Sequence, residues 1–229
     1  MKKMIINTFY ALTALAISFN VTAAGSSVPL EKANTDINDQ KSLQNGAKLF
    51  MNYCAACHSI ELMRYNRIGQ DLNISDKELQ DNLIFGDEKA GDPITASISE
   101  EGAIKWFGTT PPDLSLVSRS KGVDWIYTYL HSFYEDKSRP FGVNNKVLTN
   151  ASMPDVLWDL KQSKSDKEFD QDIRDITNFL DYVGEPAKLI RIDLGYKVLG
   201  FLFILFILSY LLKKEYWKDV KYGKWRAKD

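Results

Sequence analysis

The chain contains two cysteines, and both lie with a histidine in one short segment, CAACH at residues 54–58. Residues three apart share one face of a helix, so Cys54 and Cys57 can reach the same group while the adjacent His58 turns its imidazole toward it. In an exported protein this spacing is typical of haem attached through two thioether bonds, with the histidine as an iron ligand. We therefore predict one covalently attached haem c, held by Cys54 and Cys57, with His58 as an axial ligand of the iron.

Three other chemistries use closely spaced cysteines. A thioredoxin-like dithiol opens a helix after a strand, whereas this motif follows a helical pattern. A structural zinc site needs four ligands, and the only other histidine of the sequence is His131. A disulfide between residues so close together closes too small a loop to stabilise the fold much. Haem attachment is the interpretation that uses both cysteines and the histidine.

The second axial ligand follows by elimination among five methionines. Two of them lie in the predicted signal peptide, and two lie too near His58 in sequence to reach the opposite haem face easily. Met153 remains, and the proline that follows it sets the local backbone. A histidine and methionine pair leaves no open position on the iron and raises the reduction potential, as electron transfer requires. His131, within the aromatic segment WIYTYLHSFY, is the alternative ligand.

Helices must position these ligands, and the expected fold is mainly α. Apolar residues recur at steps of three and four over residues 43–57 and again over residues 169–183, where a glycine and a proline then end the pattern. Gly46 lies beside the first apolar face, where it either permits close approach of the second helix or is a neutral surface glycine. Short helices are also expected at 76–85 and 123–133, and a turn or helix at 113–120, within otherwise loop-rich sequence.

Residues 1–24 have the anatomy of a secretory signal peptide. Lys2 and Lys3 precede an apolar run of about fifteen residues, and small residues follow at the expected cleavage site. An uncleaved N-terminal anchor is the alternative, although this apolar run is shorter than the ~20 residues that cross a bilayer. In both cases the body of the protein, residues 25–190, is exported.

A second apolar run, at residues 195–212, contains Lys197 as its one charged residue. We predict a transmembrane helix at 191–212, with tyrosines and a tryptophan at its two interfaces. A buried core helix is the alternative, but such helices usually have a polar face. The tail, residues 213–229, is rich in lysine and should therefore lie in the cytoplasm, which leaves the body in the periplasm of a bacterial inner membrane.

The formal net charge of −1 conceals an uneven distribution. Between the two N-terminal lysines and the basic tail, the chain has 20 basic and 27 acidic residues, a net charge of about −7. This charge argues against a nucleic-acid partner and favours a basic protein. Acidic clusters at 87–88 and 166–175 either steer such a partner or are simply solvated.

Two basic residues are candidates for the haem pocket. Buried carboxylates need cationic partners, and Arg119 and Lys121 follow the two prolines that end at Pro112. These residues either neutralise the haem propionates or form a solvated basic turn. The sequence does not decide between the two interpretations.

The order of several segments resembles the cytochrome c1 family, the haem-bearing subunits of bacterial ubiquinol:cytochrome c oxidoreductase. The resemblance covers almost the whole chain after the signal peptide and implies a cytochrome c-type haem domain with loop insertions plus one C-terminal membrane helix. It assigns haem attachment to Cys54 and Cys57, and the axial ligands to His58 and Met153. It also implies that the Pro112 carbonyl meets the His58 ring. The segments are NGAKLFMNYCAACHSIELMRYNR, WFGTTPPDLSLVSRSKGVDWIYTYLHSFY, RPFGVNN, SMPDVLW and EPAKLIRIDLGYKVLG.

One position departs from the family pattern. The family usually has a second arginine where this chain has Lys121. A lysine is a point charge and cannot form the two parallel hydrogen bonds of a guanidinium, so a bidentate contact with a haem propionate is not expected there.

The resemblance implies a relay for single electrons. The protein would accept an electron from the Rieske iron-sulfur protein and pass it to a soluble or membrane-bound cytochrome c, while cytochrome b oxidises the quinol. It would do no bond-making chemistry itself, and the proton-translocating complex would be dimeric and embedded in membrane lipid. Two alternatives stay open: a membrane-tethered cytochrome shuttle outside any complex, and a haem enzyme such as a peroxidase, which would need an open position on the iron.

Overall fold

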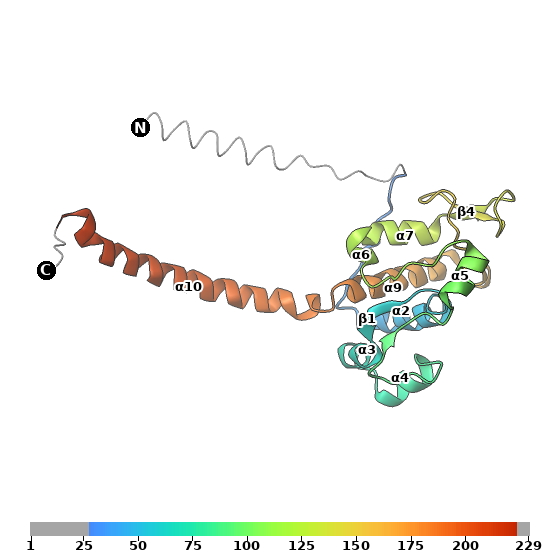
Figure 1. Cartoon of the computed structure of the whole chain (residues 1–229), viewed down its shortest axis with the longest axis horizontal. Coiled ribbons are helices and arrows are strands. Elements are labelled where there is room, and N and C mark those ends of the chain that lie inside the picture. Colours follow the sequence, from blue (N-terminus) through green and yellow to red (C-terminus); the bar gives the residue numbers. More distant parts are fainter. Residues whose placement is uncertain (1–27, 224–229) are drawn as a thin grey trace.

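The computed structural model of the chain describes residues 28–223, so the predicted signal peptide at 1–24 and the end of the tail lie outside the described residues. Within this part the chain is mainly helical, with two small antiparallel sheets (Figure 1). The helices are α2 (Gln40–Tyr53), α3 (Tyr65–Asp71), α4 (Asp76–Asn82), α5 (Glu100–Phe107), α6 (Val117–Ser120), α7 (Val123–His131), α8 (Trp158–Ser163), α9 (Asp166–Gly184) and α10 (Lys188–Lys221). The strands are β1 (Ile60–Arg64), β2 (Pro93–Ile94), β3 (Phe133–Glu135) and β4 (Val143–Asn145).

Helices α2 and α9 cross at the centre of the body, as the two apolar patterns predicted. A Cβ atom at Gly46 would lie 2.0 Å from the carbonyl oxygen of Asp175, so only glycine allows this crossing. The rings of Phe50 and Phe179 meet beside it, with centroids 5.6 Å apart. The close-approach interpretation of Gly46 is therefore confirmed.

The start of each crossing helix is capped by a side chain. Asp39 accepts hydrogen bonds from the first backbone N–H groups of α2. At α9, Ser165 and Glu168 form a reciprocal capping box, which satisfies two backbone donors that the helix itself cannot satisfy. The two helices that cross at Gly46 thus begin at residues defined by local sequence.

Helix α7 packs on α9. The short helix α6, just before α7, contacts both α7 and α9. The expected helix at 123–133 ends at His131, because Phe133 pairs with Asn145 in the β3–β4 hairpin. The expected element at 113–120 is helical only from Val117. Before it, Leu114 donates its N–H to the Ser59 carbonyl at 2.8 Å instead of joining a helix.

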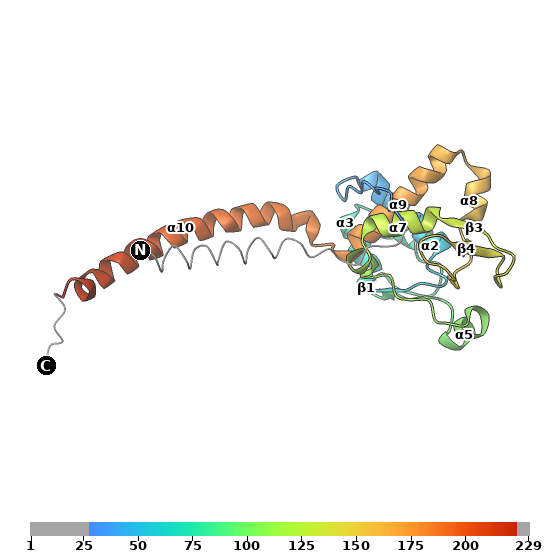
Figure 2. The same cartoon turned by 90° about the horizontal axis from the view of Figure 1, so that it is seen from above.

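Helix α10 extends away from the body (Figure 1), and Figure 2 shows the same separation from above. Its 34 residues contain an 18-residue window with a mean hydropathy of 2.0, none of which is buried in the protein. At 1.5 Å per residue the helix is ~51 Å long, which exceeds the ~30 Å hydrocarbon core of a bilayer. An exposed apolar helix of this length fits a membrane anchor, with turns to spare at each end.

An ionic cluster fixes the start of this anchor. Glu185, between α9 and α10, accepts from Arg119 of α6 at 2.7 Å and from Arg191 of α10 at 2.7 Å. Lys188 pairs with Asp181 at 3.2 Å. The cluster ties the first turn of α10 to the body.

Candidate haem-binding site

The CAACH segment forms the turn that follows α2. The N–H of Cys54 still bonds to the Phe50 carbonyl, and the N–H groups of Cys57 and His58 both turn back to the Cys54 carbonyl, at 3.0 and 2.8 Å. Cys54 is buried and Cys57 is half-buried, and neither is in a disulfide. The helical turn therefore places both sulfur atoms and the imidazole at the end of the central helix.

A backbone carbonyl orients the His58 ring. Its Nδ1 lies 2.8 Å from the Pro112 carbonyl oxygen, the contact expected from the sequence. Because the carbonyl can only accept, Nδ1 carries the proton and Nε2 is left as the free donor atom for a metal. Burial lowers the pKa of His58, although the Pro112 bond and the charge of Asp113 oppose the shift, so the ring is neutral, as an iron ligand must be.

The segment that carries this carbonyl is itself fixed on β1. Asp113 accepts from the backbone N–H of Glu61 at 2.9 Å and from that of Ser115 at 2.8 Å. Ser115 in turn accepts from the N–H of Leu62 at 3.1 Å. The carbonyl that orients His58 thus belongs to a loop anchored to the strand directly after the CAACH turn.

A cavity of about 630 Å³ brings the predicted ligands together. Cys54, Cys57, His58 and Met153 all line it, although Met153 lies almost a hundred residues further along the chain. The remaining lining is mostly apolar and aromatic, and it includes Leu62, Leu116, Leu130, Val156 and Leu180. An apolar cavity lined by two cysteines, a free imidazole nitrogen and a thioether sulfur fits haem c, whose ring is flat and apolar and whose iron takes nitrogen and sulfur ligands.

The cysteines do not have the character of a redox dithiol. Burial, with a smaller contribution from the Cys57 charge, raises the pKa of Cys54 to about 12, and burial raises the pKa of Cys57 as well. Catalytic dithiols have lowered thiol pKa values, because the thiolate is the reactive form. The thioredoxin-like alternative therefore has no support in the environment of either sulfur.

Comparison with known proteins agrees with this geometry. The sequence profile described as "Cytochrome C1 family" matches residues 31–220. The chain belongs to the cytochrome c1 family. Proteins of this family carry one covalently bound haem c and are electron-transfer subunits of cytochrome bc1 complexes.

Individual relatives cover most of the chain. A "Cytochrome c1" of Allochromatium vinosum is 48% identical over 96% of this chain and 100% of its own length. A "Cytochrome c1" of Rhodospirillum rubrum is 28% identical over 80% of this chain and 84% of its own. A Nitrosomonas europaea protein is 40% identical over 93% of this chain and 97% of its own, and is named "Ammonia monooxygenase gamma subunit". That name does not carry over, because the family match and the other two relatives point to cytochrome c1.

The loop that carries Met153 is held by residues that the sequence interpretation did not single out. Arg139 donates to the Asn150 carbonyl at 2.9 Å, and the Asn144 side chain accepts from the Asn150 N–H at 2.9 Å. Asn150 has φ +64°, a left-handed conformation that asparagine tolerates better than most residues. The RPFGVNN segment, which contributes to the cytochrome c1 resemblance, contains Arg139 and Asn144 and is the signal from which this support could have been found.

Tyr129 is a further residue of the site that the sequence interpretation missed. It lines the cavity, and its hydroxyl donates to Met153 Sδ at 3.5 Å. Burial raises the pKa of Tyr129 to about 12, so the hydroxyl keeps its proton at neutral pH. The sequence places Tyr129 only within the aromatic segment around His131.

The two basic candidates differ in position. Lys121 lines the cavity, and its Nζ lies 5.7 Å from the centre of the Trp125 ring. Arg119 is not among the lining residues in the described part of the chain, because its guanidinium is directed to Glu185. The propionate contact remains a prediction for both residues.

His131, the alternative iron ligand, lies elsewhere. Its Nε2 is 3.3 Å from a carboxylate oxygen of Asp170, and its ring packs against Tyr127 and Phe169. It is not among the lining residues within 28–223. Met153 is therefore the candidate that the structure brings into one cavity with His58.

Proposed function

We propose that the protein takes single electrons from the Rieske iron-sulfur protein of a cytochrome bc1 complex and passes them to a cytochrome c. The observation that carries this proposal is the cavity shared by Cys54, Cys57, His58 and Met153. Bound there, haem c would supply a one-electron couple. The protein would contribute the attachment, the ligands and a surface for the two redox partners.

Each residue has a separate role in this proposal. Cys54 and Cys57 would hold the haem covalently, and His58, oriented by Pro112, would supply one iron ligand. Met153 would supply the second iron ligand, which would leave no position for a small molecule. A filled coordination sphere favours electron transfer over peroxidase chemistry, and a methionine ligand raises the reduction potential.

The membrane arrangement follows from charge and length. We expect residues 191–212 of α10 to cross the bilayer, since they hold most of its apolar run. After Leu212 the chain has seven basic and three acidic residues, which favours a cytoplasmic tail. The body, residues 25–190, would then lie in the periplasm of a bacterial inner membrane, where the covalent attachment of haem c is expected.

The partners belong to the same proposal. One relative, from Candida albicans, is named "Cytochrome b-c1 complex catalytic subunit, mitochondrial" and is 28% identical over 82% of this chain. We expect this chain to assemble likewise with cytochrome b and the Rieske protein, in a dimeric complex within membrane lipid. The acidic body suits a basic cytochrome c as electron acceptor.

Replacing Met153 by leucine tests the ligand and the relay together. Leucine keeps the apolar volume but cannot bind iron, so the reduction potential should fall by more than ~60 mV, a tenfold change for a one-electron couple. The measurement is an optical redox titration of the protein purified from membranes. Met63→Leu is the matched control, because Met63 is buried but does not line the cavity. The reduction potential of the haem in this variant should equal that of the wild type.

Copurification decides between the complex and a solitary carrier. The proposal expects a b-type cytochrome in the same preparation as this c-type haem. If the protein purifies alone from gently solubilised membranes, the tethered-shuttle alternative replaces the bc1 relay. An unchanged potential in Met153→Leu would instead remove Met153 as the ligand.

A further inference from the structure

Tyr129 is placed to act on the iron through Met153. Its side chain projects from α7 into the cavity, and the residue is 9% exposed. Its hydroxyl lies 3.5 Å from Met153 Sδ, with the hydroxyl as donor. A thioether sulfur is a weak acceptor, so this contact depends on how firmly the donor is held.

The donor is held from three sides. The Tyr129 ring stacks on Trp125, with centroids 5.0 Å apart and planes at 9°, and meets the edge of Phe133 at 5.3 Å and 74°. The Asn145 side chain donates to the Tyr129 carbonyl at 2.7 Å. The ring thus has little freedom to rotate away, and the hydroxyl stays directed at the sulfur.

The sulfur of a methionine has two lone pairs. If one binds iron, as the proposed function requires, the other is free to accept the Tyr129 hydroxyl. A hydrogen bond withdraws electron density from the sulfur and so weakens its donation to the iron. Ferric iron depends on this donation more than ferrous iron does, so the ferric state is destabilised more and the reduction potential rises. We propose that Tyr129 is a positioning residue that acts through Met153: its hydroxyl donates to Met153 Sδ and thereby raises the reduction potential of the haem.

This inference rests on the proposed ligation by Met153 and goes beyond it. A tyrosine that merely fills space would leave the potential unchanged when its hydroxyl alone is removed, since phenylalanine retains the stacking with Trp125 and Phe133. Tyr129→Phe therefore separates the hydrogen bond from the packing.

The test is the reduction potential of Tyr129→Phe in the full-length protein purified from membranes, with covalent haem content as a check of assembly. We expect the equilibrium constant for reduction to fall about fivefold, the effect of losing one neutral hydrogen bond, or about 40 mV at 59 mV per tenfold change. The weak long-wavelength absorption band of ferric haem that reports a bound methionine should persist to higher pH than in the wild type, because the ferric iron–sulfur bond is stronger.

Tyr127→Phe is the matched control. Tyr127 lies two residues earlier on α7, and its hydroxyl bonds to Asp170 and Arg174 outside the cavity. Its loss should leave the potential at the wild-type value. A fall in potential specific to Tyr129→Phe supports the proposal.

The failures of the two proposals are distinguishable. If the wild-type protein lacks the methionine band, Met153 does not bind iron and the proposed ligation is wrong. If the wild type has the band but Tyr129→Phe has an equal or higher potential, the ligation stands and the role of Tyr129 is overturned.

Discussion

At the scale of single residues, His58 and His131 lie in different chemical surroundings. His58 has its Nδ1 proton directed to the Pro112 carbonyl, which leaves Nε2 free for iron. His131 is surrounded by charges instead. Burial lowers its pKa most and Lys161 of α8 lowers it further, while Asp170 of α9 and Glu31 of the N-terminal segment oppose the shift without cancelling it. His58 is therefore oriented as a candidate iron ligand, whereas the protonation of His131 is coupled to folding.

The lowered pKa of His131 predicts an acid-sensitive contribution to stability. The unfolded chain takes up a proton near pH 6.5, whereas the folded protein resists it to lower pH. The contribution is thus fully present above about pH 6.5 and is lost as the pH falls toward the folded-state pKa. In His131→Gln the free energy of unfolding should fall less between pH 7.5 and about 5.5 than in the wild type.

Chemical denaturation of the detergent-solubilised protein at several pH values measures this difference. The carboxyls with lowered pKa, such as Asp124 and Asp170, also lose stability in acid, but only at lower pH, because their unfolded values lie near 4. With His58 bound to iron, His131 is the histidine left to titrate. Parallel curves for the two proteins would show that His131 has equal pKa values in the folded and unfolded states.

At the scale of elements, the α2–α9 crossing depends on one missing side chain. The Cβ of an alanine at position 46 would overlap the Asp175 carbonyl, which belongs to helix backbone and cannot rotate away. Gly46→Ala gains helix propensity of about 1 kcal/mol, yet forcing the helices apart costs about 3 kcal/mol or more. We expect a clear net loss in the free energy of unfolding and lower haem incorporation.

Gly91→Ala is the control for that substitution. A Cβ at Gly91 meets nothing within 4 Å, so the change alters backbone freedom without a clash. Thermal unfolding followed by circular dichroism, together with haem content, compares the two variants. Equal stability of both would mean that the crossing can relax and does not require glycine.

The elements that the sequence predicted well are those with a long repeating pattern. The cores of α2 and α9 each carry apolar residues at helical spacing, and α10 is apolar throughout most of its length. By contrast, α5 and the β3–β4 hairpin were not predicted. These elements are short, and their position depends on contacts such as the one between the Phe107 and Phe141 rings, 5.7 Å apart, which no local pattern encodes.

The same limit applies to the site. The CAACH residues are contiguous, so their chemistry could be inferred directly, and Met153 could be reached by elimination. The partner of Arg119 could not, because Glu185 lies 66 residues further along the chain. Nor could the support that Tyr129 gives to Met153, since two residues 24 apart meet only once α7 and the following loop are folded together.

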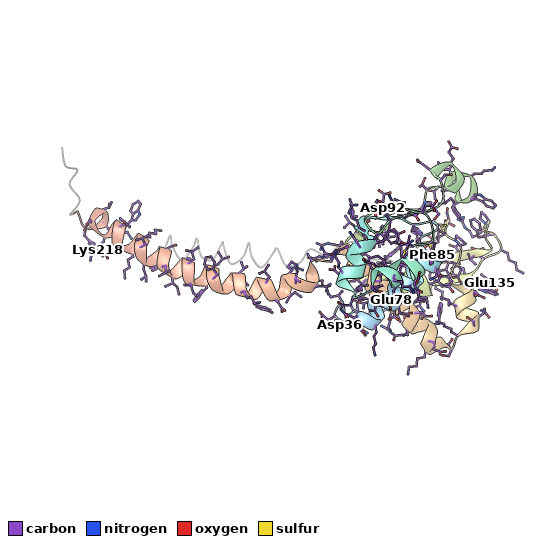
Figure 3. All side chains as sticks on the ribbon, turned by 90° about the horizontal axis from the view of Figure 1, so that it is seen from below. Asp36, Glu78, Phe85, Asp92, Glu135 and Lys218 are labelled. Carbon is purple, nitrogen blue, oxygen red and sulfur yellow. The ribbon has the colours of Figure 1, made fainter. Side chains whose placement is uncertain are left out.

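At the scale of the whole molecule, charge and shape are segregated along one axis. The body carries the acidic residues, among them Asp36, Glu78, Asp92 and Glu135, and Lys218 lies near the far end of α10 (Figure 3). Between them lies an apolar helix longer than a bilayer is thick. If α10 spans the membrane as proposed, the acidic haem domain would lie on one side and the basic tail on the other.

This segregation predicts which side of the membrane each end occupies, and single introduced cysteines test it. The native Cys54 and Cys57 would be consumed by the haem thioethers, so a new cysteine is the one free thiol. Glu101→Cys, on the exposed surface of α5, should react with a membrane-impermeant maleimide in cells whose outer membrane has been permeabilised. Lys221→Cys, at the end of α10, should react only after the inner membrane is broken, because the lysine-rich tail is retained in the cytoplasm. The reverse pattern would place the haem domain in the cytoplasm, while labelling of both sites in such cells would mean that α10 does not span the membrane.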